Sequence, residues 1–293
     1  MQFIRTVCII ISILFSISAA EAQQSLPLNA KSALVYDADS DEVLYQKDSA
    51  GIRPIASITK LMTAVVTLEA GLDMSEQILI TEEDVANTMV NKKPSGSSLP
   101  AGSVLTREEL LRLTLMNSQN RAASALARTY PGGTELFVRA MNDEAQSIGM
   151  VNTTYVDPTG LYNDNVSSAN DLAILLTTAQ NWQEIKDFST AREYSPNEVD
   201  KTYSTTNRLL ATDSWNISLQ KTGYIKQAGR CMVMLTQVAY KNVIIVLLNT
   251  TSPELRARDA TLIKYWLEND ALPSHKTLLQ LTPYKHNTKI KRR

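Results

Sequence analysis

The stretch Ile55-Ala-Ser-Ile-Thr-Lys-Leu-Met-Thr-Ala64 opens a dense apolar run and carries a serine and a lysine three residues apart. The apolar residues continue to Ala70, and Gly71 follows them, so the pattern predicts a largely buried helix that begins at Ser57. Residues three apart lie on the same face of a helix, with Cβ atoms about 5–6 Å apart. The Lys60 amine is therefore expected to reach the Ser57 hydroxyl.

Two polar triplets follow at long intervals, Ser118-Gln119-Asn120 and Lys221-Thr222-Gly223. The first lies between two stretches with helical patterns, and the second ends a stretch in which apolar and polar residues alternate as in a strand. Each motif is short enough to arise by chance. The three together, in this order, match a signature of enzymes that form a serine acyl-enzyme, with Gln119 where the signature has aspartate.

Segments with strand patterns lie near both ends of the chain, and segments with helical patterns fill the middle. We expect strands at residues 32–37, 42–46, 216–221, 231–240 and 243–249. We expect helices at residues 57–70, 107–116, 120–130, 134–148, 169–180 and 254–268, and a loop at residues 91–102. This order predicts an α+β fold, in which an antiparallel sheet is built from both ends of the chain around an inserted helical region.

Residues 1–22 have the composition of a secretory signal peptide. Arg5 precedes an almost wholly apolar run at residues 6–18, and Ala20-Glu21-Ala22 then provides small residues at alternate positions for a signal peptidase. The run is shorter than the roughly 20 residues that a membrane-spanning helix needs. We therefore expect cleavage after Ala22, with cleavage after Ala20 as the second choice, and no transmembrane helix in the mature chain. An uncleaved membrane anchor is the alternative.

The mature chain is expected to form one domain, residues 23–270, followed by a basic, flexible tail at residues 271–293. Five cations lie close together in this tail: Lys285, Lys289, Lys291, Arg292 and Arg293. A solvated tail is the simpler interpretation, and weak contact with anionic lipid or wall polymer is the alternative. The whole chain carries 29 basic and 30 acidic residues, a balance that argues against nucleic acid as its main partner.

The histidine and cysteine content excludes several kinds of active site. The two histidines, His275 and His286, both lie near the end of the chain, which argues against a Ser-His-Asp triad and against a histidine-rich zinc site. Cys231 is the one cysteine outside the signal segment, and its strand-like surroundings favour a buried structural residue. We therefore expect no intramolecular disulfide, no metal and no cofactor.

A lysine is left as the base for a serine nucleophile. A free lysine has a pKa of about 10.4 and is protonated at neutral pH. Burial and a second nearby cation both lower the pKa of a lysine. We expect the apolar helix to bury Lys60, and Lys221 to be the second cation.

With these motifs, the sequence resembles the low-molecular-mass penicillin-binding proteins, which are serine D-alanyl-D-alanine peptidases of the S11 type. The resemblance covers residues 29–270 and is closest to the short D-alanyl-D-alanine endopeptidases of the penicillin-binding protein 7 type, as Tyr130-Pro-Gly-Gly133 and Asp157-Pro-Thr-Gly-Leu161 indicate. It implies a β-lactamase/transpeptidase-like fold. Gln119 stands where relatives often carry glycine or glutamate, and Tyr224 stands where some carry histidine.

The resemblance also implies a role for each motif residue. Ser57 would be the acylated nucleophile, Lys60 its base, and Ser118 the group that relays a proton to the leaving group. The remaining positions would bind the substrate. Asn120 would hydrogen-bond its backbone, Lys221 and Thr222 would bind the carboxylate beside the scissile bond, and Gly223 would let the substrate chain lie close to the strand. The backbone N–H groups of Ser57 and Tyr224 would form the oxyanion hole.

The implied activity is hydrolysis of peptidoglycan stem peptides, in the service of cell wall biogenesis and cell shape. The scissile bond would be a D-Ala–diaminopimelate cross-link, a terminal D-Ala-D-Ala bond, or both, since a free carboxylate lies beside each. β-Lactam antibiotics would act as covalent inhibitors, and the signal peptide together with the resemblance implies a periplasmic location.

Two other functions remain as alternatives. A β-lactamase would share the acylation step, but the segment between Ser118 and Lys221 contains no Glu-x-x-Leu-Asn sequence, the source of the deacylating glutamate in class A enzymes. A catalytically silent wall-binding protein would not need the catalytic residues, and these are intact at Ser57, Lys60, Ser118 and Lys221.

Overall fold

A computed structural model of the chain describes residues 26–90, 93–94 and 98–280. The expected signal peptide and most of the expected basic tail lie outside these residues. None of the described helices is both long enough and apolar enough to cross a membrane.

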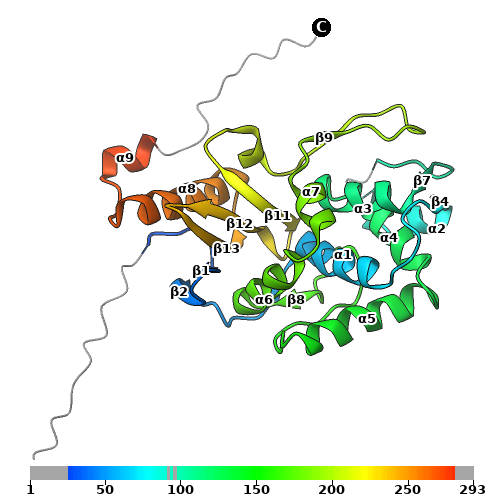
Figure 1. Ribbon diagram of the computed structural model, residues 1–293, viewed down its shortest axis with the longest axis horizontal. Helices are drawn as coiled ribbons and strands as arrows, with labels where there is room; N and C mark the ends of the chain where they lie inside the picture. Colours follow the sequence, from blue (N-terminus) through cyan, green and yellow to red (C-terminus); the bar gives the residue numbers. More distant parts are fainter. Residues whose placement is uncertain (1–25, 91–92, 95–97, 281–293) are drawn as a thin grey trace, which may run out of the picture.

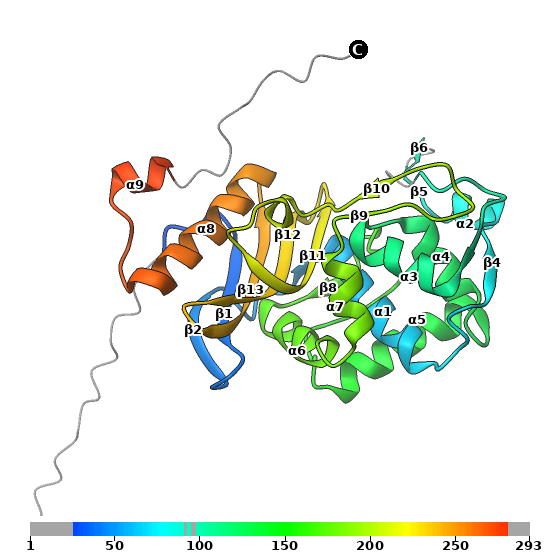
Figure 2. The ribbon, with the colours of Figure 1, turned by 45° about the horizontal axis from the view of Figure 1, so that its top comes forward.

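A five-stranded sheet joins the two ends of the chain in the order β11-β12-β13-β1-β2 (Figures 1 and 2). Its strands are β1 (Ser32–Asp37), β2 (Glu42–Lys47), β11 (Asn216–Ile225), β12 (Gly229–Val238) and β13 (Lys241–Thr250). Every neighbouring pair is antiparallel, and β1 pairs with β13 so that Leu34 faces Val246. The predicted antiparallel sheet, built from both chain ends, is confirmed.

The two faces of the sheet are covered by different layers because side chains alternate along each strand. Leu34 and Val246 belong to a large core cluster shared with the inserted helices. Val35 and Ile245 belong to a second cluster on the other face, which is covered by α8 (Pro253–Asn269). Figure 2 shows α8 on one side of the sheet and the helical region on the other.

The helical region is arranged around α1 (Lys60–Glu69), in which every residue except the last is buried. The surrounding helices are α2 (Glu82–Ala86), α3 (Arg107–Met116), α4 (Asn120–Arg128), α5 (Gly133–Ser147), α6 (Ala169–Ala179) and α7 (Gln183–Thr190). A capping box fixes the start of α3, because the Thr106 side chain accepts from the Glu109 N–H and the Glu109 carboxylate accepts from the Thr106 N–H.

Short elements connect these parts. They are η1 (Ala56–Thr59), η2 (Arg208–Ala211) and four strand pairs: β3 (Arg53–Pro54) with β8 (Val166–Ser167), β4 (Gln77–Leu79) with β7 (Val104–Thr106), β5 (Met89–Val90) with β6 (Lys93–Pro94), and β9 (Glu193–Tyr194) with β10 (Tyr203–Ser204). The strand β6 falls in the segment for which we expected a loop.

Three boundaries differ from expectation, and the first two matter for the site. Ser57 lies in the 3₁₀ turn η1, and the α-helix begins only at Lys60. Strand β11 continues to Ile225, so Lys221-Thr222-Gly223 lies inside the strand and not at its end. A short helix, α9 (His275–Gln280), lies within the range expected to be a tail.

Candidate active site

The turn that carries Ser57 is held where two other backbone segments approach it closely. Ala56 has a φ of +49°, a conformation that is costly for a residue with a side chain. A Cβ at Gly160 would lie 2.0 Å from the Ala56 carbonyl oxygen, and a Cβ at Gly223 would lie 3.0 Å from the Ser57 nitrogen. The glycines at these two positions therefore let the turn lie between β11 and the 157–160 loop.

The Lys60 side chain is fully buried and points back to Ser57. Its Nζ lies 3.1 Å from Ser57 Oγ and 2.7 Å from Asn120 Oδ1, and it also contacts the Thr159 carbonyl oxygen. A neutral amine has two N–H donors and one lone pair. These three neighbours match that inventory, because the amide and carbonyl oxygens accept and the Ser57 hydroxyl can donate to the lone pair.

The 157–160 loop, which belongs to the segment Asp157-Pro-Thr-Gly-Leu161 that supported the family resemblance, supplies one of these contacts. Asp157 Oδ1 accepts hydrogen bonds from the backbone N–H groups of Thr159 and Gly160 at 2.6 and 2.9 Å. The Thr63 hydroxyl of α1 donates to the Pro158 carbonyl oxygen at 2.6 Å. The carboxylate and the helix together aim the Thr159 carbonyl oxygen at Lys60.

Burial is the main cause of an unusual lysine pair. It lowers the pKa of Lys60 to about 7, although the Asp157 carboxylate partly opposes this shift. It also holds the pKa of Lys221 well below its usual value, with further lowering by the positive charges of Lys60 and Arg256. The expected burial of Lys60 is confirmed. The charge of Lys221 is not among the causes of the lowered Lys60 pKa, whereas the charge of Lys60 does lower the pKa of Lys221.

Ser118 and Asn120 enter the site from the corner between α3 and α4. Ser118 has a φ of +64°, a strained conformation of the kind found at functional sites. Gln119 points the other way: it is buried, its Oε1 accepts from the Ser98 N–H at 3.1 Å, and its Nε2 donates to Asn117 Oδ1. Gln119, which departs from the usual triplet, therefore stabilises the turn between α3 and α4 and does not line the cavity beside Ser57.

A cavity of about 240 Å³ brings most of the expected site residues together. We call it the serine cavity. Its lining includes six of the eight expected residues: Ser57, Ser118, Asn120, Thr222, Gly223 and Tyr224. The other two, Lys60 and Lys221, are fully buried and do not line it. Lys60 is nevertheless in hydrogen-bond contact with Ser57 and Asn120 in its wall.

Among the other residues that line the serine cavity are Thr206, Arg230 and Arg256, to which the sequence assigned no role. The Thr206 and Thr222 hydroxyls lie 2.7 Å apart, and the Arg230 guanidinium lies over the Tyr224 ring at 3.6 Å. Arg256 is 8% exposed and donates to the Cys231 carbonyl oxygen at 3.0 Å. Arg256 could have been noticed as a charge on the buried face of α8.

Cys231 is buried and unpaired, as the sequence predicted. Burial raises the pKa of its thiol to about 11, which keeps it protonated and unreactive. Within residues 26–90, 93–94 and 98–280, no group of three or more His, Cys, Asp or Glu side chains is arranged to hold a metal ion.

Comparisons with known proteins agree with this arrangement. Residues 18–252 match the family model of the D-alanyl-D-alanine carboxypeptidases, peptidase S11. The chain is 39% identical to a D-alanyl-D-alanine endopeptidase of Escherichia coli K12, over 86% of this chain and 81% of that one. It is 38% identical to an endopeptidase of the same name from Pseudomonas aeruginosa, over 90% and 86%.

Solved structures resemble the fold as well. A Streptomyces K15 DD-transpeptidase superposes with a TM-score of 0.75 and 27% identity, covering 81% of this chain and 96% of that one. Penicillin-binding protein D2 of Listeria monocytogenes, in an ampicillin-bound form, superposes with a TM-score of 0.70 and 25% identity, covering 88% and 98%. The expected transpeptidase-like fold is confirmed, and the chain belongs to the D-alanyl-D-alanine carboxypeptidase family S11, whose members are serine hydrolases.

Proposed function

We propose that the protein is a serine D,D-peptidase that acts on peptidoglycan through an acyl-enzyme on Ser57. Its substrates are D-Ala–diaminopimelate cross-links and terminal D-Ala-D-Ala bonds. The observation that carries this proposal is the contact between a fully buried lysine amine and a serine hydroxyl at 3.1 Å. Because the pKa of Lys60 is lowered to about 7, much of this amine is in the basic form at neutral pH.

Acylation follows from the positions of these groups. Ser57 Oγ attacks the carbonyl carbon of the D-Ala on the acyl side of the scissile bond, and its proton passes to Lys60 Nζ. The backbone N–H groups of Ser57 and Tyr224 stabilise the negative charge on the substrate oxygen. As the C–N bond breaks, the Ser118 hydroxyl relays the proton to the leaving amine. Water then attacks the ester carbon and releases Ser57.

The carboxylate beside the scissile bond is assigned to the end of the serine cavity that Thr222 and Arg256 line, above the buried Lys221. An arriving carboxylate raises the pKa of Lys221, because a nearby negative charge favours the protonated amine and opposes the lowering by burial and by the neighbouring cations. Asn120 positions the substrate backbone, and Gly223 leaves room for a chain along β11. Both classes of substrate carry the required carboxylate.

The names of relatives support both bonds as targets. Three of the similar proteins are named D-alanyl-D-alanine endopeptidases, and the similar protein from Bacillus subtilis is named a carboxypeptidase. The Listeria protein has been solved with ampicillin and with cefotaxime bound. We infer that β-lactams acylate Ser57 here too.

We further propose export by the signal at residues 1–22 to the periplasm, one peptidase domain at residues 23–270, and a flexible basic tail at residues 271–293.

The direct test is to incubate the mature protein with penicillin and to follow its intact mass with time, beside a Ser57→Ala variant. A lasting adduct on the native chain that is absent from the variant supports the acyl-enzyme. Rapid destruction of the drug with no lasting adduct would indicate a β-lactamase. An intact drug and no adduct would indicate a silent binding protein.

A further inference from the structure

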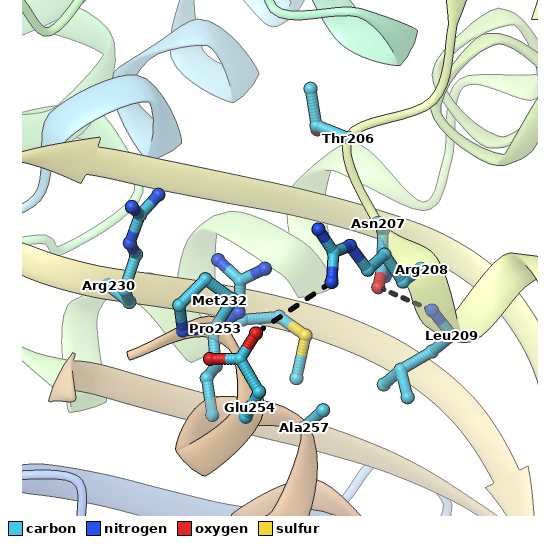
Figure 3. A pocket seen from close by; sticks show the side chains of 10 residues that line it. Thr206, Asn207, Arg208, Leu209, Arg230, Met232, Pro253, Glu254 and Ala257 are labelled. Atoms are coloured by element: carbon cyan, nitrogen blue, oxygen red, sulfur yellow. Dashed lines mark hydrogen bonds and ion pairs between the residues drawn. The ribbon is translucent and has the colours of Figure 1, made fainter. Parts of the chain in front are cut away.

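A second cavity of about 150 Å³ adjoins the serine cavity, and Thr206, Arg230 and Arg256 line both. We call it the arginine cavity. Figure 3 shows its walls, which come from η2 and the residues before it, from β12, and from the first turn of α8. It extends from the end of the serine cavity assigned to the substrate carboxylate. Because that carboxylate belongs to the leaving residue, the arginine cavity lies on the leaving-group side of the scissile bond.

Its charged lining favours an anion. Three arginines, Arg208, Arg230 and Arg256, line it with one carboxylate, that of Glu254. Arg256 is nearly buried and is fixed by its hydrogen bond to the Cys231 carbonyl oxygen. Stacking on Tyr224 occupies one face of the Arg230 guanidinium and leaves its N–H groups directed outward in the plane of the group.

An ion pair crosses the cavity between η2 and α8. Arg208 and Glu254 point toward one another in Figure 3, with 3.8 Å between Nη1 and Oε1. The two side chains are 61% and 56% exposed, so the pair is only weakly stabilised. A carboxylate that enters the cavity can therefore compete with Glu254 for Arg208.

We propose that the arginine cavity is a leaving-group subsite that binds a second carboxylate, one carried by the released half of a cross-linked peptide. This inference rests on the proposed peptidase function. A terminal D-Ala leaving group has a single carboxylate, and the serine cavity already holds it. The leaving half of a cross-link is a second stem peptide with further carboxylates. The subsite thus gives the enzyme a preference for cross-links over terminal D-Ala-D-Ala, with the same bond chemistry at Ser57.

The test measures kcat/KM of the mature protein on three substrates. They are a cross-linked muropeptide dimer, the same dimer with the acceptor-stem carboxylates amidated except for the one beside the scissile bond, and a pentapeptide that ends in D-Ala-D-Ala. Arg208→Ala and Arg208→Lys are compared with Arg139→Ala. Arg139 is also an exposed arginine with a carboxylate partner, Asp143, but it lies on α5, away from both cavities.

We expect Arg208→Ala to lower the ratio of the dimer to the pentapeptide value about tenfold, as for one charge-assisted hydrogen bond. Most of this loss should appear in KM. Arg208→Lys should restore part of it, amidation should lower the native ratio similarly, and Arg139→Ala should keep the native ratio. Equal losses on all substrates, or no effect of amidation, would overturn the subsite alone. A native protein that cleaves none of the three substrates and forms no penicillin adduct would overturn the proposed function as well.

Discussion

The serine cavity and the arginine cavity use cations in different ways. Behind the wall of the serine cavity, Lys60 and Lys221 are fully buried, and burial lowers the pKa of both. In the arginine cavity, Arg208 is mostly exposed, and even the nearly buried Arg256 has its pKa lowered only to about 10. A buried lysine can give up its proton, as the proposed base Lys60 must, whereas arginine keeps its charge. The depth of burial and the choice of side chain together decide whether a cationic residue can serve as a base.

The largest effect on the acylation rate is expected for Lys60→Arg, which tests whether the buried amine at position 60 must lose its proton. Arginine retains a positive charge but does not deprotonate near neutral pH, so acylation of Ser57 should slow by about 10²–10⁴-fold. Stopped-flow or mass-resolved acylation by penicillin measures the rate. Because arginine is larger than lysine in a fully buried position, Lys60→Met provides a second variant, and thermal unfolding checks that both fold. Acylation at the native rate by Lys60→Arg would show that charge, and not basicity, is what the site needs.

Gly160→Ala tests the close packing of the 157–160 loop against the turn that carries Ser57. The new Cβ would meet the Ala56 carbonyl oxygen at 2.0 Å, and Gly160 has a φ of +77°. The left-handed conformation and the overlap together predict a loss of about 2–5 kcal/mol in the free energy of unfolding. Denaturant titration measures it.

Gly149→Ala is the matched control. Gly149 has a φ of +88° and nothing within 4 Å of an added Cβ, so it carries the conformational cost alone, about 1–2 kcal/mol. Equal losses in the two variants would mean that the contact with the Ser57 turn contributes nothing.

The same contrast explains what the sequence could predict. The apolar periods placed the five strands of the main sheet, most of the helices and the buried position of α1, because they report burial directly. They did not reveal the short strands β3 to β10. The three motifs named groups that lie around one cavity. The sequence did not reveal that the Thr159 carbonyl oxygen bonds Lys60, because a backbone acceptor has no residue signature.

The helix α7 was missed because Gln183–Thr190 is short and carries several polar residues. The arginine cavity was missed for a different reason. Arg208 and Glu254 look like ordinary surface charges in the sequence, and Arg230, in the segment Ala228-Gly-Arg-Cys231 that shares in the family resemblance, was not assigned a role. What brings these arginines together is the adjacency of η2, β12 and the start of α8 in three dimensions. Short-range periodicity has no access to such an arrangement.

The pH dependence of acylation tests the lowered pKa of Lys60, the proposed base. Lys60 accepts a proton only in its neutral form, and its pKa is lowered to about 7. The rate should therefore be nearly constant well above pH 7 and fall as pH drops through it, by about tenfold at one unit below the pKa. The rate constant of penicillin acylation between pH 5.5 and pH 9 provides the measurement, and circular dichroism at each pH checks that the protein is folded. A profile that rises only above pH 9 would mean that Lys60 keeps the pKa of a solvated lysine.

The smallest effect is expected from salt, which should change binding at the arginine cavity but not the protonation of Lys60. Raising the ionic strength from about 0.1 to about 1 M shortens the Debye length from about 10 to about 3 Å, which screens exposed charges far more than buried ones. KM for the cross-linked dimer should rise roughly two- to fivefold, because Arg208 and Arg230 face solvent. The midpoint of the pH profile should stay near its low-salt value, because it belongs to an amine that solvent ions do not reach. If instead the midpoint moved with salt while KM did not, Lys60 would be accessible to solvent ions and the arginines would not. That result would contradict the roles of Lys60 as a buried base and of the arginine cavity as the anion-binding site.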